Sequence, residues 1–186
     1  MSKHLRHAAA HRRLLLKGLA ALPLGLNFGR AQASVADSDC ELCFRHTHTD
    51  ESLRIVYRSG GTYVPSALER IDWLMRDFRT GDVARIDPRL LDILHTLRTN
   101  CGGESFEIIS AFRSPTTNEK LHKADGTGVA TRSLHMDGRA IDVRIPGFDT
   151  AALRDAALAL KAGGVGYYPE SDFVHLDTGR VRHWGA

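Results

Sequence analysis

Two histidines and one aspartate are spaced so that they could share a metal ion. His135 and Asp142 lie close together in the sequence, and His175 follows in a later strand-like segment, 173–177. Two histidines and a carboxylate suit a catalytic zinc, because three protein ligands leave a fourth position for water. Zinc lowers the pKa of that water towards about 7 and so supplies hydroxide at neutral pH. On spacing alone, surface or capping roles for these histidines stay open.

Strands and a turn must bring the three side chains together. On a strand expected over 139–145, alternation places Asp142 on the polar side and its apolar neighbours in the core. Gly138 lets the chain turn, so that His135 can come back towards Asp142. The same alternation in the later segment places His175 on the polar side of a second strand.

Helical and strand-like patterns follow one another along the rest of the chain. Apolar residues recur at steps of three and four after Pro65, which predicts a helix with its cap at Ser66 and its end near Gly81. Asp87 and Pro88 are the expected cap and first residue of a second helix. We further expect strands at 53–57, 106–110, 165–168 and 173–176, and helices at 117–123 and 150–161. These elements predict a single α+β domain, an antiparallel sheet with flanking helices.

The first 33 residues have the composition of an export signal. They carry six lysines or arginines and no acid, and Arg12 and Arg13 are adjacent. An apolar run at 18–28 precedes Ala31-Gln32-Ala33, a small-x-small cleavage pattern. This order is typical of a secretory signal peptide, and the paired arginines indicate the twin-arginine route to the periplasm. An uncleaved anchor is the alternative, but the apolar run is about half the roughly 20 residues that span a bilayer. We expect a twin-arginine signal peptide at 1–33, a polar segment at 34–46 and the folded domain at 47–186.

The charge balance argues against nucleic acid as a partner. The 186 residues have a formal net charge of +3, but without the first 33 the chain carries 19 basic and 22 acidic residues. A nucleic-acid-binding domain needs a basic surface to neutralise phosphates. Beyond the leader, no segment is apolar enough to cross a membrane, so we expect no membrane span after signal cleavage.

Three cysteines leave several roles open. Cys40, Cys43 and Cys101 allow at most one disulfide in an oxidising compartment. Cys40 and Cys43 have the spacing of a redox pair, although they precede a strand-like segment rather than a helix start. His46 and His48 follow, so a second metal site is an alternative, but the spacing matches no common zinc module. A simple disulfide or buried thiols is the favoured interpretation.

The residues around the trio form a recognisable motif. The pattern is Ser133-x-His135-x-x-Gly138-x-Ala140-x-Asp142, followed by Val174-His175-x-Asp177. It resembles the zinc D-Ala-D-Ala peptidase superfamily, which includes D,D-carboxypeptidases, murein endopeptidases and the hedgehog signalling domain.

The resemblance extends over most of the chain. The segment 109–114 is similar to the family's Ser-Gly-Tyr-Arg-Ser, although Ala111 and Phe112 depart from it. The segments at 163–169, 173–179 and 182–184 are similar to the YcbK-like branch, which contains small exported murein endopeptidases. Two residues within the first of these, Tyr167 and Tyr168, either line the substrate groove or pack within the sheet.

The resemblance implies the hedgehog/D-Ala-D-Ala peptidase fold, zinc as cofactor and peptidoglycan as substrate. His135, Asp142 and His175 would bind the zinc, and Arg113 would stabilise the oxyanion of the tetrahedral intermediate. The reaction would be hydrolysis of a peptide cross-link, between two diaminopimelate residues in the YcbK-like branch. The alternatives are a D,D-carboxypeptidase, a non-catalytic cell-wall-binding module that retains zinc, and a thiol-redox protein.

The general base has three candidates. Many relatives place a glutamate three residues before the last histidine ligand, and here that position is Asp172. Asp177 is the second candidate because it shares a face with His175, although it could instead orient that histidine ring. His183 is the third, since some relatives use a histidine near the metal.

Overall fold

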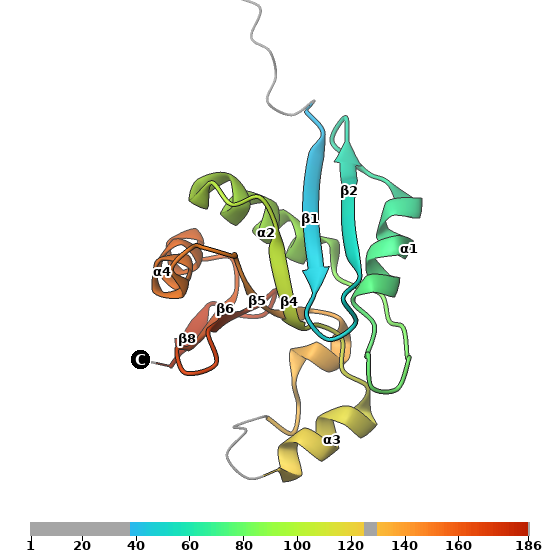
Figure 1. The fold of residues 1–186 in the computed structure, drawn as a ribbon, viewed down its shortest axis with the longest axis vertical. Helices are drawn as coiled ribbons and strands as arrows, with labels where there is room; N and C mark the ends of the chain where they lie inside the picture. Colours follow the sequence, from blue (N-terminus) through green and yellow to red (C-terminus); the bar gives the residue numbers. More distant parts are fainter. Residues whose placement is uncertain (1–37, 125–129, 186) are drawn as a thin grey trace, which may run out of the picture. The chain divides into compact units, whose positions relative to one another are not determined.

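An eight-stranded sheet with helices against one face organises the domain. The computed structural model describes residues 38–124 and 130–185, so the expected signal peptide at 1–33 lies outside the described residues. The strands follow the order β3-β2-β1-β4-β5-β7-β6-β8 across the sheet (Figure 1). They are β1 Cys40–His46, β2 Ser52–Ser59, β3 Thr62–Tyr63, β4 Phe106–Ser110, β5 Ala140–Arg144, β6 Gly164–Tyr168, β7 Phe173–Asp177 and β8 Arg182–Trp184.

Three of the four α-helices within 38–124 and 130–185 pack the core against the sheet. The helices are α1 Pro65–Leu74, α2 Pro88–Cys101, α3 Pro115–Lys123 and α4 Thr150–Leu160. Buried residues of α1, α2 and α4 share one cluster with Ile141 and Val143 of β5. Because side chains alternate along a strand, Asp142 lies on the opposite face, as predicted. The α+β prediction is confirmed, and the sheet is mostly antiparallel, since only β1 with β4 and β6 with β8 run parallel among the described strands.

The start of α2 follows the sequence prediction, whereas α1 does not. Asp87 accepts the backbone N–H of Arg89 and Pro88 is the first helical residue of α2. In α1, Val64 stands at the cap position and no side chain caps the helix, so Ser66 is not its cap. Helix α1 also ends at Leu74, well before the predicted end.

The early end of α1 has a physical cause in the turn that follows. The backbone N–H groups of Thr80 and Gly81 both donate to the carbonyl of Asp77. The buried carboxylate of Asp77 accepts hydrogen bonds from the backbone N–H and the hydroxyl of Ser114, at 2.9 and 2.7 Å. These side-chain bonds tie the turn to the start of α3. The backbone N–H of Asp77 donates forward along the chain to the carbonyl of Asp82 at 2.9 Å, a bond that a continuing α-helix could not form.

Strand β1 corrects the predicted domain boundary. The polar composition of 34–46 predicts a segment outside the domain, but Cys40–His46 form a strand inside the sheet. Leu42 and Phe44 are buried in the core, while Arg45 on the other face is exposed. The outward side chains give the segment its polar appearance, and the domain therefore includes Cys40 onwards.

All three cysteines are free thiols. Cys40 packs in the core, whereas the thiol of Cys43 lies on the opposite face of β1, 3.9 Å from the carboxylate of Glu41. Burial raises the pKa of both Cys43 and Cys101, which makes these thiols less reactive. Two cysteines on opposite faces of one strand cannot act as a redox pair. The two cysteines of β1 are buried free thiols, which agrees with one of the favoured interpretations.

Five positions on five neighbouring strands form one row on the face away from the helices. Backbone pairing joins Ser110 to Asp142, Asp142 to His175, His175 to Gly166 and Gly166 to Trp184. A shift in register just before Ser110 brings that residue into the row, because a bulge re-aims the side chains that follow it. We call these five positions the site row.

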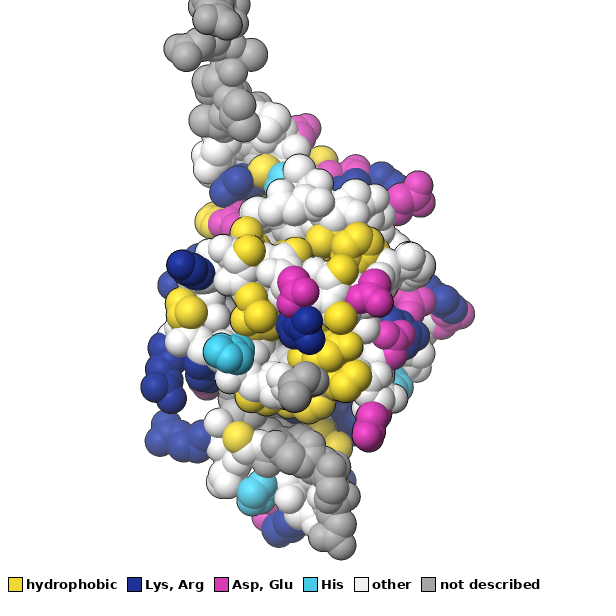
Figure 2. All heavy atoms as spheres, turned by 90° about the vertical axis from the view of Figure 1, so that its left-hand side faces the viewer, with side chains coloured by type: hydrophobic (Ala, Val, Ile, Leu, Met, Phe, Trp, Pro, Cys, Tyr) yellow, Lys and Arg dark blue, Asp and Glu magenta, His cyan; other side chains and the backbone are white. Residues whose placement is uncertain are grey.

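The outer surface carries both signs of charge. Figure 2 shows the side on which α4 and β8 lie, where basic and acidic side chains are interspersed around apolar ones. No helix within 38–124 or 130–185 combines the length and the apolar character needed to cross a membrane.

Candidate metal centre

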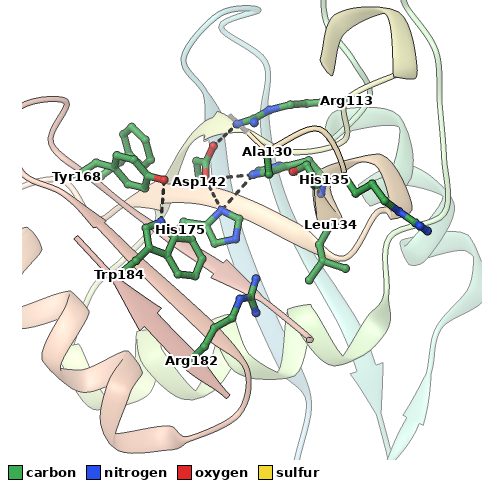
Figure 3. A pocket seen from close by; sticks show the side chains of 12 residues that line it. Arg113, Ala130, Leu134, His135, Asp142, Tyr168, His175, Arg182 and Trp184 are labelled. Atoms are coloured by element: carbon green, nitrogen blue, oxygen red, sulfur yellow. Dashed lines mark hydrogen bonds and ion pairs between the residues drawn. The ribbon is translucent and has the colours of Figure 1, made fainter. Parts of the chain in front are cut away.

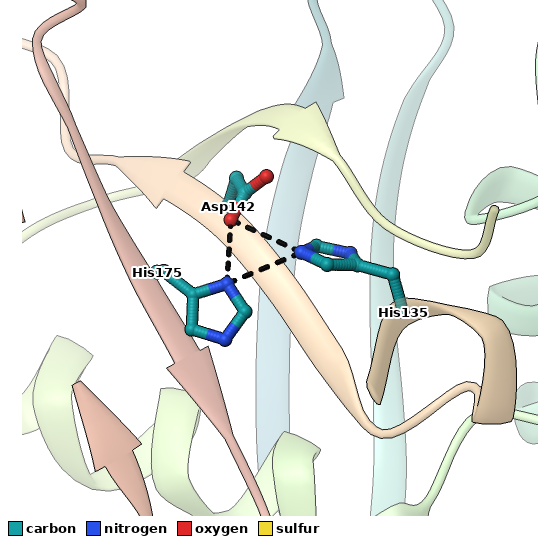
Figure 4. Close-up of side chains that lie close together, drawn as sticks. All are labelled: His135, Asp142 and His175. Carbon is teal, nitrogen blue, oxygen red and sulfur yellow. Dashed lines mark hydrogen bonds and ion pairs between the residues drawn. The ribbon is translucent and has the colours of Figure 1, made fainter. Parts of the chain in front are cut away.

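His135, Asp142 and His175 meet in the structure, with ligand atoms within 4.8 Å of one another (Figure 4). Two of them are paired neighbours in the site row. His135 comes from the 3₁₀ helix Leu134–Asp137, which ends at Gly138 with a φ of 65°. A side chain at Gly138 would lie 2.0 Å from a backbone carbonyl oxygen, so the turn that returns His135 to β5 requires glycine.

The spacing of the three ligand atoms fits a tetrahedral metal site. Nε2 of His135 lies 3.2 Å from Oδ1 of Asp142 and 3.2 Å from Nδ1 of His175, and the latter two atoms are 2.8 Å apart. Ligands about 2.0 to 2.1 Å from a tetrahedral zinc stand about 3.3 Å from one another. Among the described residues this is the one group of histidine, cysteine and acidic side chains with such a geometry.

Hydrogen bonds on the far side of each ring decide which nitrogen faces the cluster. Nδ1 of His135 lies 2.6 Å from the carbonyl oxygen of Ala111, which can only accept, so Nδ1 donates. Nε2 of His175 lies 3.1 Å from a carboxylate oxygen of Asp177 and donates in the same way. The free lone pairs of both rings and the carboxylate of Asp142 therefore point at one another, an arrangement that calls for a cation between them.

The pKa values of the three groups are shifted in different directions by burial and by their contacts with one another. Burial is the main reason why the pKa of His135 is lowered, which keeps this ring neutral and able to ligate. Burial raises the pKa of Asp142, but its contacts with the two histidines outweigh burial and hold it well below the usual range. Burial lowers the pKa of His175, yet hydrogen bonds to Asp142 and Asp177 raise it above its usual value.

Asp177 holds the ring of His175 rather than facing the ligand atoms. Its buried carboxylate accepts from the backbone N–H of Gly164 at 3.0 Å and of Gly179 at 2.8 Å, and pairs with Arg182 at 2.6 Å. Burial raises the pKa of Asp177, but its hydrogen bond with His175, together with these bonds, outweighs burial and holds the pKa well below its usual range. Because Asp177 contacts the nitrogen of His175 that points away from the cluster, its position fits ring orientation better than proton transfer.

The other two candidate bases lie outside the cluster. Asp172 accepts from Thr150 at 2.9 Å and pairs with Arg144 at 3.4 Å, and its side chain is 60% exposed. His183 is exposed on β8, between two residues whose side chains line the cavity, so its own side chain points to the opposite face. Neither residue lines the cavity beside the cluster.

Arg113 is bound to a metal ligand. Arg113 forms an ion pair with Oδ2 of Asp142, whereas Oδ1 of Asp142 contacts both histidines. The Nε of Arg113 donates to the hydroxyl of Ser110 at 2.8 Å. The backbone N–H of Arg113 donates to the carbonyl of His135 at 3.2 Å. Arg113 thus positions the carboxylate of Asp142, a role that the sequence did not predict. Its predicted role at the oxyanion stays a prediction.

A cavity opens beside the cluster, and the three side chains of the cluster line it. Arg113, Tyr168, Arg182 and Trp184 surround Asp142 and His175 at this opening (Figure 3). Sequence reasoning missed the carbonyl of Ala111, the hydroxyl of Ser110 and the side chains of Arg182 and Trp184. Alternation along 182–184 would place the last two on one face, but only the pairing of β8 with β6 shows that this face meets the cluster.

Replacing Asp177 with asparagine tests its role in orienting His175. We expect zinc affinity to fall by about 10- to 100-fold, as is usual when a residue that orients a metal-bound histidine is changed. Competition with a chromophoric chelator measures this affinity. Asp172→Asn is the matched control, the same change at an exposed carboxylate, and should leave zinc affinity unchanged.

The same two variants separate orientation from proton transfer. If Asp177→Asn lost activity while its zinc affinity stayed at the wild-type value, Asp177 would be the base and not an orienting residue. If Asp172→Asn showed that pattern instead, Asp172 would be the base despite its contacts with Arg144 and Thr150.

Comparison with known proteins finds relatives along most of the chain. Residues 34–184 match the family model described as Peptidoglycan L,D-endopeptidase MepK. The peptidoglycan L,D-endopeptidase MepK of Escherichia coli (strain K12) is 41% identical over 144 residues, which cover 77% of this chain and 79% of that protein. The probable peptidoglycan L,D-endopeptidase MepK of Haemophilus influenzae is 40% identical over 145 residues, 77% of each chain. No solved structure matches significantly.

Proposed function

Because the chain belongs to the peptidoglycan L,D-endopeptidase MepK family, we propose that it is a zinc metallopeptidase that hydrolyses peptide cross-links of peptidoglycan. The bond is that between two diaminopimelate residues. The relatives' names support the substrate class. The observation that carries the chemistry is the convergence of two histidine lone pairs and a buried carboxylate at the edge of an open cavity.

Some residues of the site would hold the metal ion, and others orient the side chains that hold it. Bound by Nε2 of His135, Oδ1 of Asp142 and Nδ1 of His175, a zinc ion would polarise the scissile carbonyl and lower the pKa of a water molecule. Ala111 and Asp177 fix the two imidazole rings, and the ion pair with Arg113 fixes the carboxylate. In the net reaction the water oxygen bonds to the carbonyl carbon, the C–N bond breaks and the amine nitrogen gains a proton.

The proposed location is the periplasm, reached by the twin-arginine pathway. The sequence of 1–33 supports this proposal through its paired arginines, its apolar run and the small-x-small pattern at 31–33. Peptidoglycan lies outside the cytoplasm, so a hydrolase of its cross-links must act there.

Digestion of purified sacculi tests the proposed function. Zinc-loaded protein comprising residues 34–186 is incubated with sacculi, and the released muropeptides are identified by mass. We expect dimers joined through two diaminopimelate residues to disappear, to persist when a chelator is present, and to disappear again when zinc is restored.

Each other outcome contradicts a defined part of the proposal. Loss of D-alanine-linked dimers alone, or of terminal D-alanine, would keep the metal chemistry and overturn the choice of bond. Binding of the folded, zinc-loaded protein to sacculi without any hydrolysis would make it a cell-wall-binding module.

A further inference from the structure

Tyr168 and Trp184 form a hydrogen-bonded pair at the wall of the catalytic cavity. Nε1 of Trp184 lies 2.9 Å from the hydroxyl oxygen of Tyr168, and both side chains line the cavity together with the three ligands. In Figure 3 this pair stands beside His175 and Asp142, with the tyrosine hydroxyl directed towards the cluster. The proposed function assigns no role to either residue.

The sheet fixes the position of this pair. Trp184 occupies the end of the site row, and its ring lies over Gly166, where a side chain would come within 2.5 Å of ring atoms. The rings of Trp184 and His175 have centroids 5.1 Å apart. The ring of Tyr168 stacks on Phe173 at 4.6 Å. The hydroxyl of Tyr168 is therefore held at the side of the cluster by packing on two sides.

The hydrogen bond with Trp184 leaves the proton of Tyr168 to be donated elsewhere. An indole nitrogen can only donate, so the hydroxyl oxygen of Tyr168 must be the acceptor in this bond. A phenol has one proton of its own to donate. No acceptor for it is found among residues 38–124 and 130–185, and the hydroxyl borders the cavity.

Two guanidinium groups of the cavity already hold carboxylates of the site, and the hydroxyl of Tyr168 adds a donor of another kind. Arg113 is engaged with Asp142 and Ser110, and Arg182 is engaged with Asp177. Hydrolysis of a peptide bond builds negative charge on the carbonyl oxygen, and preorganised donors aimed at that oxygen lower the barrier. We propose that Tyr168 is a catalytic residue, whose hydroxyl donates a hydrogen bond to the carbonyl oxygen as its negative charge develops. This inference rests on the proposed peptidase function.

Tyr168→Phe removes the hydroxyl and keeps the ring that stacks on Phe173. We expect kcat on a purified diaminopimelate-linked muropeptide dimer to fall about 100-fold with KM nearly unchanged, close to the loss of one oxyanion donor. The affinity for a phosphinate analogue of the scissile bond should fall by a similar factor. Zinc content, measured by mass spectrometry, should equal that of the wild type.

The neighbouring tyrosine supplies a matched control. Tyr167 packs against the core, and its ring lies 4.6 Å from the guanidinium of Arg154, on the side of β6 away from the cavity. Tyr167→Phe makes the same chemical change and should leave kcat and analogue affinity within about twofold, well below the loss of an oxyanion donor.

The outcomes separate this inference from the proposed function. Equal kcat for wild type and Tyr168→Phe would overturn the inference alone, as would a fall in kcat with unchanged affinity for the phosphinate. An equal loss in Tyr167→Phe would mean that the effect is structural and would also overturn it. A zinc-loaded wild-type protein that leaves the dimer uncut would overturn the proposed function, and the inference with it.

Discussion

His135→Ala should abolish both metal binding and hydrolysis of the muropeptide dimer. The change removes the ligand atom Nε2, which lies 3.2 Å from each of the other two ligand atoms, and leaves Asp142 and His175 alone. Activity should fall by roughly 10⁴-fold or more, a large part of the 10⁶-fold or greater acceleration typical of enzymes. The measurements are bound zinc by mass spectrometry and the rate of dimer cleavage.

His183→Ala is the matched control for this experiment. The substitution also removes a histidine, but from an exposed position on β8 whose side chain does not line the cavity. Zinc content and rate should stay at the wild-type values. Substantial activity in His135→Ala would refute the assigned ligand set, whereas loss of activity in His183→Ala with zinc retained would make His183 the base.

Arg113→Ala should have the second largest effect, because it leaves a buried carboxylate without its ion-pair partner. The side chains of Arg113 and Asp142 are only 11% and 5% exposed. Removing one member of a buried pair is costly, since the remaining charge is poorly solvated. We expect kcat/KM to fall by about 10²- to 10³-fold, comparable to the loss of an important electrostatic group in an active site.

Zinc affinity distinguishes the two roles of Arg113. If Arg113 positions Asp142, the affinity should fall together with kcat, and Arg113→Lys should restore part of both. A lower kcat with unchanged zinc affinity would contradict that role and favour the oxyanion role expected from the sequence. Arg144→Ala, two residues from Asp142 on β5, is the control. Its ion pairs are with Glu107 and Asp172, outside the cluster, so the change should alter neither quantity by more than about twofold.

Local patterns predicted where His135 and Asp142 lie, because alternation and turn chemistry decide their placement. The strand around Asp142 and the turn at Gly138 are both encoded within a few residues, and they bring His135 to β5 as expected. The strand β7, which carries His175, was also predicted from its alternation of polar and apolar residues. Alternation predicted the face on which each side chain lies, whereas the adjacency of β7 to β5 depends on the sheet order and was implied only by the resemblance.

The general base could not be predicted in the same way, because it depends on contacts between distant segments. Asp172 stands at the expected offset before His175, but Thr150 and Arg144 hold its carboxylate outside the cavity. Asp172 itself has a φ of 52°, so the alternation of β7 does not extend to it. The place of β1 inside the sheet was missed for a related reason. Its outward residues are polar, and its position depends on pairing with β4, which lies far along the chain.

The site row separates the residues that maintain the fold from those that decide the reaction. Its five strands are aligned by backbone hydrogen bonds and by the apolar residues on their other face, neither of which depends on the side chains in the row. Each strand thus contributes one position to a shared surface, and Gly166 is the position that must stay small because the ring of Trp184 lies over it. Such a scaffold can evolve in small steps, because one strand at a time can change the chemistry while the architecture is inherited intact.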